Sequence, residues 1–259
     1  MLEVEDRIAP HPVLSEYYAS EAERRKRVDE MFESSAVHYD WINSVMSFGS
    51  GVRYRQQVLT KLGVEPGMRV LDAGSGTGVV ARLEQDMVGD SGMVVALDPS
   101  KGMLGVAKKR GVQLATQGLG EKLPFADQQF DRITMCYALR HVEDLKSLFA
   151  EYLRVLKPGG KLLILEISRP ESRVGHFLLN IYMRSIVPTL TRIFRRSAEA
   201  QELMRYYWDT IEHCVPPADI LESMRSVGLE EARRDLSFGT FSEYSASKRD
   251  CSAGKNSDN

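Results

Sequence analysis

The stretch MRVLDAGSGTG at residues 68–78, followed by GMVVALD at residues 92–98, decides the fold. Each segment is a short apolar run rich in β-branched residues, and the first ends in a glycine-rich turn that leads into a helical stretch. A strand, a glycine turn, a helix and a second strand are the parts of a βαβ unit. The sequence therefore predicts parallel strands with helices packed against them.

This alternation continues for about a hundred residues. We expect helices over residues 100–111 and 144–160, and strands over residues 112–118, 130–139 and 161–168. A last pair of strands is expected within residues 229–248. The fold class is therefore α/β, with a parallel, doubly wound sheet.

Segments outside this alternation are expected to be helical. Residues 21–46 have apolar side chains near helical spacing, and the apolar, arginine-flanked residues 176–194 read as a helical lid. Two more helices are expected at residues 199–211 and 217–227. The predicted domains are an N-terminal helical arm or substrate cap (1–60), a catalytic domain (61–248) with the lid inserted at about 171–215, and a disordered tail (249–259).

Composition and charge exclude several classes of protein. The 259 residues carry 34 basic and 36 acidic side chains, a formal net charge of −2, whereas nucleic-acid binding needs a surplus of Lys and Arg. Cys136, Cys214 and Cys251 are too far apart for a zinc site, so we expect no metal. A reducing, cytoplasmic setting suits three unpaired cysteines. We expect no transmembrane segment, because no run of eighteen apolar residues occurs.

The glycine turn and the acid that ends the second strand indicate a ligand. Glycines at 74, 76 and 78 let the backbone turn sharply and approach a bound molecule closely, although they do not follow the GxGxxG spacing. Asp98 follows Asp72 by 26 residues and is placed to accept both hydroxyls of a ribose. Because no lysine with Ser or Thr follows the turn, as it does in a P-loop, we predict a nucleoside that carries an amino acid.

Between about Met31 and Pro170, the sequence motifs resemble those of a known family. The chain is similar to the ubiquinone and menaquinone C-methyltransferases, the UbiE type, among class I S-adenosylmethionine-dependent methyltransferases. The glycine loop is shared by most of that superfamily, whereas the YDxxNxxxSFG block, LPFxDxxFD and the xLRxV segment are more specific to this family. The matching motifs are MFESSAVHYDWINSVMSFG, VLDAGSGTG, VVALDPSKGML, EKLPFADQQFD, YALRHV and RVLKPGGKLLILEISRP. The resemblance implies a mostly parallel, seven-stranded Rossmann-like sheet and S-adenosylmethionine as the cofactor.

The resemblance also assigns residues. The resemblance implies that Arg140 takes part in proton removal near the substrate ring. It implies that Tyr39 and Asp40 close over the methyl donor. His141 is a minor catalytic candidate. The alternative for Arg140 is a structural salt bridge to Asp144 or Glu166. The alternative for Tyr39 and Asp40 is simple helix packing. The expected cofactor-binding residues are Asp72, Gly74, Gly76, Thr77, Asp98, Pro99, Leu119, Gly120 and Cys136.

The chain also departs from the family. Most members have Asn where this chain has His141, and Asn or Asp near Leu119. The family usually ends in a glycine-rich strand followed by Leu-His-Arg, and this chain has SFGTFSEYSASK at residues 237–248. Because this last third forms the substrate side of the pocket, the sequence defines the methyl donor better than the methyl acceptor.

Three functions therefore remain open. The first is C-methylation of a polyprenyl benzoquinol or naphthoquinol. The second is C-methylation, with or without cyclisation, of a prenyl diphosphate in terpenoid synthesis, with basic residues 24–27 or 195–196 holding the diphosphate unless they are solvated surface. The third is a cofactor-binding subunit without catalysis. The expected partner is a hydrophobic small molecule and not nucleic acid. The sequence is compatible with an oligomeric protein. The 176–194 segment predicts peripheral contact with the inner face of a membrane, or else a helix packed on the sheet.

Overall fold

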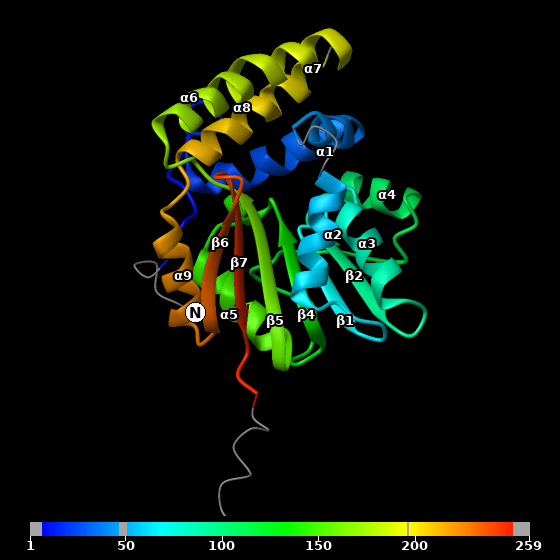
Figure 1. The fold of residues 1–259 in the computed structure, drawn as a ribbon. Coiled ribbons are helices and arrows are strands. Elements are labelled where there is room, and N and C mark those ends of the chain that lie inside the picture. The colour runs from blue at the N-terminus through cyan, green and yellow to red at the C-terminus, as the bar shows by residue number, and fades with distance from the viewer. Residues whose placement is uncertain (1–6, 47–50, 196, 251–259) are drawn as a thin grey trace, which may run out of the picture.

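The computed structural model describes residues 7–46, 51–195 and 197–250. At the centre is a seven-stranded sheet in the order β3-β2-β1-β4-β5-β7-β6 (Figure 1). The strands are β1 (Arg69–Ala73), β2 (Met93–Asp98), β3 (Leu114–Gln117), β4 (Phe130–Cys136), β5 (Leu156–Ile167), β6 (Glu230–Ser237) and β7 (Phe241–Ser247). The first five are parallel, and β7 runs antiparallel between β5 and β6. The α/β class and the mostly parallel seven-stranded sheet are confirmed.

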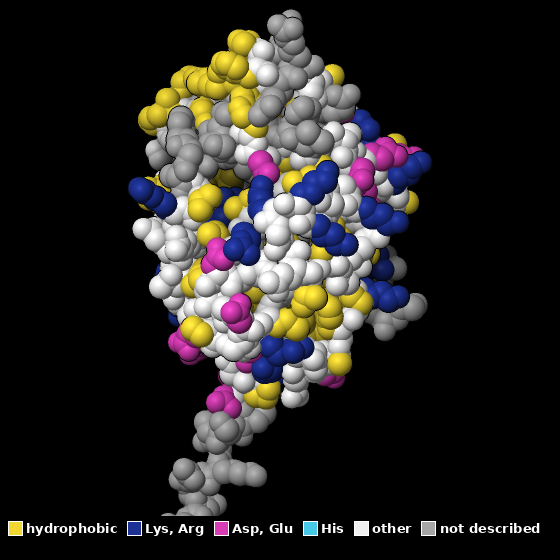
Figure 2. Space-filling model, turned by 90° about the vertical axis from the view of Figure 1, so that its right-hand side faces the viewer, with side chains coloured by type: hydrophobic (Ala, Val, Ile, Leu, Met, Phe, Trp, Pro, Cys, Tyr) yellow, Lys and Arg dark blue, Asp and Glu magenta, His cyan; other side chains and the backbone are white. Residues whose placement is uncertain are grey.

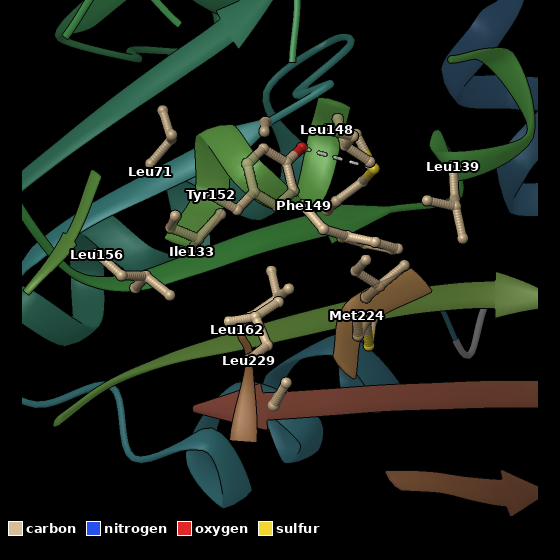
Figure 3. Close-up of a cluster of buried hydrophobic side chains, with 14 of the residues drawn as sticks. Leu71, Ile133, Leu139, Leu148, Phe149, Tyr152, Leu156, Leu162, Met224 and Leu229 are labelled. Carbon is tan, nitrogen blue, oxygen red and sulfur yellow. Dashed lines mark hydrogen bonds between the residues drawn. The ribbon is translucent and has the colours of Figure 1, made fainter. Parts of the chain in front are cut away.

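Helices cover both faces of the sheet (Figure 1). On one face lie α2 (Gly51–Leu62), α3 (Val79–Val88) and α4 (Lys101–Lys109), and on the other lie α5 (Leu145–Val155) and α9 (Pro217–Ser226). Strand β5 contributes side chains to the hydrophobic cores on both faces of the sheet. Leu162 and Ile164 belong to the cluster under α5 and α9. Leu163 and Leu165 belong to the cluster under α2 and α3. This is the two-residue period of a strand that is buried on both faces. Figure 3 shows the first cluster, with Leu148, Phe149 and Tyr152 of α5 packed on the strands.

A third core lies above the carboxyl ends of the parallel strands. There α1 (Glu21–Met46) packs against α7 (Val187–Arg195) and α8 (Ala198–Glu212), next to α6 (Arg173–Ile181) (Figure 1). The shared side chains include Val28 and Met31 of α1 and Leu203, Tyr206 and Tyr207 of α8. The predicted arm and lid therefore meet each other above the sheet.

One predicted helix boundary was wrong, and one predicted helical segment is interrupted. The helix expected to reach residue 160 ends at Val155, because Pro158 has no N–H to donate and Leu156 already pairs with Phe130 of β4. The 176–194 segment is helical, as expected, but a π-helical turn at Tyr182–Ile186 separates α6 from α7 within it. Pro188 has no N–H to offer the Arg184 carbonyl, which is a recognised reason for such an interruption.

Candidate functional site

The glycine loop has the backbone that the sequence predicted. Gly74, Gly76 and Gly78 all have positive φ, a conformation that side chains with a Cβ rarely adopt. A Cβ on Gly74 would also lie 2.6 Å from the Cβ of Ala138. The loop is fixed to the neighbouring strand, because the N–H groups of Gly74 and Ser75 both donate to the carbonyl of Leu97. It therefore forms a bare backbone surface at the end of β1.

Asp98 lies at the end of β2 and faces this loop. One carboxylate oxygen accepts the N–H of Gly76 at 2.8 Å, and the other accepts the N–H of Ser100 at 2.9 Å. Each oxygen keeps a second lone pair for a ligand. Burial raises the pKa of Asp98 to about 6, although the two backbone donors work in the opposite direction. Asp98 is thus a charged acceptor above pH 6, held in one orientation.

An open cavity of about 730 Å³ extends from Asp98 across the ends of β1 and β4. Between these strands the chain order of the sheet reverses, which is where open α/β sheets bind ligands. The structure brings nine of the predicted site residues into its wall. They are Tyr39, Gly74, Gly76, Asp98, Pro99, Leu119, Gly120, Cys136 and His141. Burial raises the pKa of Cys136 well above its ordinary value, so the wall carries a neutral thiol there.

Asp72 lies behind the glycine loop and not in the cavity wall. Its carboxylate accepts the N–H of Ala81 at 2.9 Å, near the start of α3. Burial, as the largest cause, raises its pKa to about 7. Glu84 of α3 is also fully buried, accepts the Thr134 hydroxyl at 2.7 Å, and has a pKa raised by burial and by Asp72. The loop therefore rests on two buried acids that repel each other when both are charged.

Thr77 and Asp40 connect the arm to the loop. The Thr77 hydroxyl donates to Asp40 at 2.5 Å, and the Arg110 guanidinium pairs with the other oxygen of Asp40. Further along α1, Glu33 accepts the hydroxyl of Ser100 at 2.5 Å and the N–H of Gly102 at 2.9 Å. Two acids of α1 thus bind the loops that surround the cavity, while Tyr39 reaches its wall.

Arg140 does not reach the cavity wall. Its side chain is 2% exposed, and its Nε donates to Glu166 at 2.8 Å. Its Nη1 donates to the Tyr207 carbonyl and to the Thr210 hydroxyl of α8. Asp144, the other partner considered, instead caps α5 by accepting the N–H of Ser147. The geometry therefore matches the structural salt bridge to Glu166, and Arg140 links two strand ends to α8.

Aromatic rings form part of the wall, and further rings of α8 pack against His141. The Phe32 ring lies 5.0 Å from the His141 imidazole and 6.1 Å from the Tyr39 ring. The rings of Tyr206 and Tyr207 lie at 5.5 and 5.8 Å from His141, at interplanar angles of 27° and 28°. Phe32, Tyr39 and His141 therefore give the cavity an aromatic wall, against which a planar ligand ring can pack.

Sequence reasoning assigned no site role to some of the wall residues. Asp29 and Phe32 precede Tyr39 by ten and seven residues on α1, and all three line the cavity. This helical spacing was a usable signal, because it places them on one face. Tyr137 has φ of +63°, and the Arg55 guanidinium lies 4.9 Å from its ring centroid. Tyr137 also lines the cavity, and strained backbone of this kind clusters at functional sites.

The residues present fit a nucleoside that carries an amino acid. Asp98 keeps free lone pairs for ribose hydroxyls, the glycine loop leaves no room for a Cβ at Gly74, and Leu119 and Gly120 line the same cavity. The fold and this site define a class I S-adenosylmethionine-dependent methyltransferase. The ubiE/COQ5 methyltransferase family matches residues 20–248, and the chain belongs to that family.

Individual relatives agree with this assignment. The chain is 38% identical to the ubiquinone/menaquinone biosynthesis C-methyltransferase UbiE of Shewanella sediminis over 196 residues, which cover 73% of this chain and 78% of the relative. It is 36% identical to the demethylmenaquinone methyltransferase of Renibacterium salmoninarum over 235 residues, 88% of this chain and 96% of the relative.

Solved structures are similar in fold alone. A SAM-dependent methyltransferase of Thermotoga maritima has a TM-score of 0.60 at 21% identity and covers 85% of this chain and 99% of its own. A phosphoethanolamine N-methyltransferase of Haemonchus contortus has a TM-score of 0.61 at 18% identity, with 90% of this chain and 61% of its own covered.

Proposed function

We propose that the enzyme transfers the methyl group of S-adenosylmethionine to a ring carbon of a polyprenyl benzoquinol or naphthoquinol. The observation that carries this proposal is the aromatic wall of Phe32, Tyr39 and His141, which belongs to the same cavity as Asp98. A planar acceptor and the donor would thus meet in one space. The names of the relatives, which act in ubiquinone and menaquinone biosynthesis, support the same acceptor class.

The chain's own residues would hold and enclose the reactants. Asp98 would accept the ribose hydroxyls, and the glycine loop would lie against the donor. The cofactor supplies an electrophilic methyl group on a positive sulfonium. Helix α1, held by Glu33 and Asp40, would cover the reactants and exclude water. The ring carbon exchanges one hydrogen, which leaves as a proton, for the methyl group.

The basic cluster at residues 24–27 gives little support to a diphosphate substrate. Arg24 is buried and donates to the carbonyls of Arg140 and Val142. Arg25 pairs with Asp29 and Glu143, Lys26 with Glu30, and Arg27 with Glu30 and Glu202. Carboxylates and backbone carbonyls of the protein therefore already pair with these four basic side chains. The side chains of Arg195 and Arg196 lie outside the described residues.

We further propose peripheral contact with an anionic membrane, from which a polyprenyl quinol would enter. The exposed side chains of α6 include Val174, Phe177 and Leu178, and Ile193 and Phe194 are exposed on α7. Figure 2 shows hydrophobic side chains gathered at the end of the molecule that carries these helices. Such a face, with the exposed Arg173 and Arg184 on the same helical segment, is typical of a helix that lies on a lipid surface. Within the described residues, no helix is long and apolar enough to cross a membrane.

Flotation with vesicles tests this contact. The wild type is expected to float with vesicles that contain anionic lipid, whereas a Phe177→Gln, Leu178→Gln variant stays in the soluble fraction. A Leu114→Gln variant, which changes an exposed apolar residue on β3, should float like the wild type. A wild type that does not float contradicts the proposal.

The acceptor is tested by parallel incubations with methyl-labelled S-adenosylmethionine. One contains a short-tailed demethylated quinol kept reduced, and the other contains farnesyl diphosphate. We expect label in the quinol. Label in a diphosphate or terpene product, or in neither extract, would overturn the proposed acceptor.

A further inference from the structure

His141, which lines the cavity, carries a buried polar atom that has no hydrogen-bond partner among the described residues. The residue follows β4 in a short 3₁₀ turn (Leu139–His141) and lines the cavity wall. Its Nε2 is buried and has no hydrogen-bond partner among the described residues. A buried polar group without a partner is costly, so such an atom in a cavity wall indicates a ligand group.

The imidazole is held in one orientation. Its Nδ1 lies 3.4 Å from the Tyr206 hydroxyl, and the ring is flanked by Tyr206 and Tyr207 on its faces and by Phe32 at 5.0 Å. Burial, and next the nearby Arg140, hold the pKa of His141 well below its ordinary value. The ring is therefore neutral, which avoids repulsion with a positive sulfonium in the same cavity.

The chemistry of a neutral imidazole defines the missing partner. One ring nitrogen carries a hydrogen and the other accepts. If Nδ1 donates to Tyr206, Nε2 is an acceptor, and if Tyr206 donates to Nδ1, Nε2 is a donor. A hydroxyl group satisfies both cases, because it donates and accepts. The isoprenoid chain of a prenyl diphosphate satisfies neither.

We propose that His141 Nε2 forms a hydrogen bond with a ring hydroxyl of the methyl acceptor and so selects hydroxylated rings over isoprenoid chains. This inference rests on the proposed function and names the residue that recognises the methyl acceptor. It also gives a physical role to a position at which the chain departs from its family, since asparagine, the usual residue there, also donates and accepts.

A cycle of variants and ligands tests the contact. Acceptor dissociation constants are measured for wild type, His141→Phe and His141→Asn, each with a short-tailed quinol and with its analogue that lacks the hydroxyl next to the methylated carbon. We expect the wild type to bind the quinol about tenfold more tightly than the analogue. His141→Phe should bind both equally, and His141→Asn should restore most of the preference. His213→Phe, at an exposed histidine beyond α8, is the matched control and should behave as wild type.

Other readouts separate this contact from a structural role. In steady state, His141→Phe should raise KM for the quinol about tenfold, while the dissociation constant of S-adenosylmethionine stays unchanged. An equal loss of donor affinity would overturn the inference, because it would make the donor the partner of Nε2. If His141→Phe does not fold, the two affinities of the wild type are sufficient for the test. Equal affinity of the wild type for the quinol and the analogue overturns the inference.

The two proposals fail in different ways. If the wild type methylates no quinol, the proposed function fails whatever His141 does. If it methylates the quinol but shows no preference for the hydroxyl, only the role of His141 fails.

Discussion

At the scale of single residues, Asp98 predicts a pH dependence of donor binding. Its pKa is raised to about 6, chiefly by burial, and only the carboxylate accepts both ribose hydroxyls. Protonation below pH 6 therefore weakens binding. We expect the dissociation constant of S-adenosylmethionine to be constant above pH 7 and to rise by about tenfold per pH unit well below 6. Calorimetry between pH 5 and 8 measures this, and Asp98→Asn should bind weakly without the pH step. A constant affinity in the wild type over this range would contradict the role of Asp98.

Glu84 predicts a pH dependence of stability. Burial and Asp72 raise its pKa well above the ordinary value, so between the two values the folded state holds a proton that the unfolded state has released. Rising pH through this window therefore lowers the free energy of unfolding. Glu84→Gln does not titrate and can still accept from Thr134.

We expect Glu84→Gln to match the wild type in Tm near pH 4.5 and to exceed it by about 3 °C at pH 8. Thermal unfolding at the two pH values gives the answer. Asp86→Asn, at an exposed acid of the same helix that pairs with Arg82, is the control and should show no such trend. A Glu84→Gln protein that loses stability more at pH 8 than at pH 4.5 would refute the argument.

At the scale of elements, α1 is held over the cavity by Glu33 and Asp40. These pairs are partly exposed, so their loss should affect closure more than global stability. For the Glu33→Gln, Asp40→Asn variant we expect donor dissociation to be severalfold faster, with Tm within about 2 °C of wild type. Stopped-flow displacement measures the rate. Glu30→Gln, on the same helix but paired with Lys26 and Arg27, should leave the rate unchanged. An unchanged rate in the double variant would show that α1 does not retain the donor.

The Arg140–Glu166 pair joins the ends of β4 and β5 to α8. Removal of one partner leaves a buried charge uncompensated, which costs about 3–5 kcal/mol. Arg140→Ala should therefore lower Tm by about 10 °C and, assayed at low temperature where it is folded, keep most of its turnover.

Arg82→Ala is the control for this prediction, because it breaks only an exposed pair. An Arg140→Ala protein with wild-type Tm and no turnover would instead assign Arg140 to proton removal.

At the scale of the whole molecule, local patterns predicted the sheet and the donor end of the cavity. The glycine loop and Asp98 are encoded within 25 residues of each other, and their geometry follows from a strand, a turn and a helix. Tertiary contacts decided the rest. The direction of the Arg140 side chain depends on Tyr207 and Thr210, which are 67 and 70 residues away in sequence. The aromatic wall likewise brings Phe32 and Tyr39 of α1 next to His141, which lies far away in sequence, and no local pattern contains that information.

The most direct test of the account is the position of the transferred methyl group. The enzyme is incubated with S-adenosylmethionine carrying a deuterated methyl group and with a reduced, short-tailed demethylated quinol. The product is then analysed by mass spectrometry and NMR. We predict one added methyl group with all three deuterium atoms, bonded to a ring carbon. A deuterated methyl group on a ring oxygen, or a quinol recovered without label while the donor binds, would contradict the account.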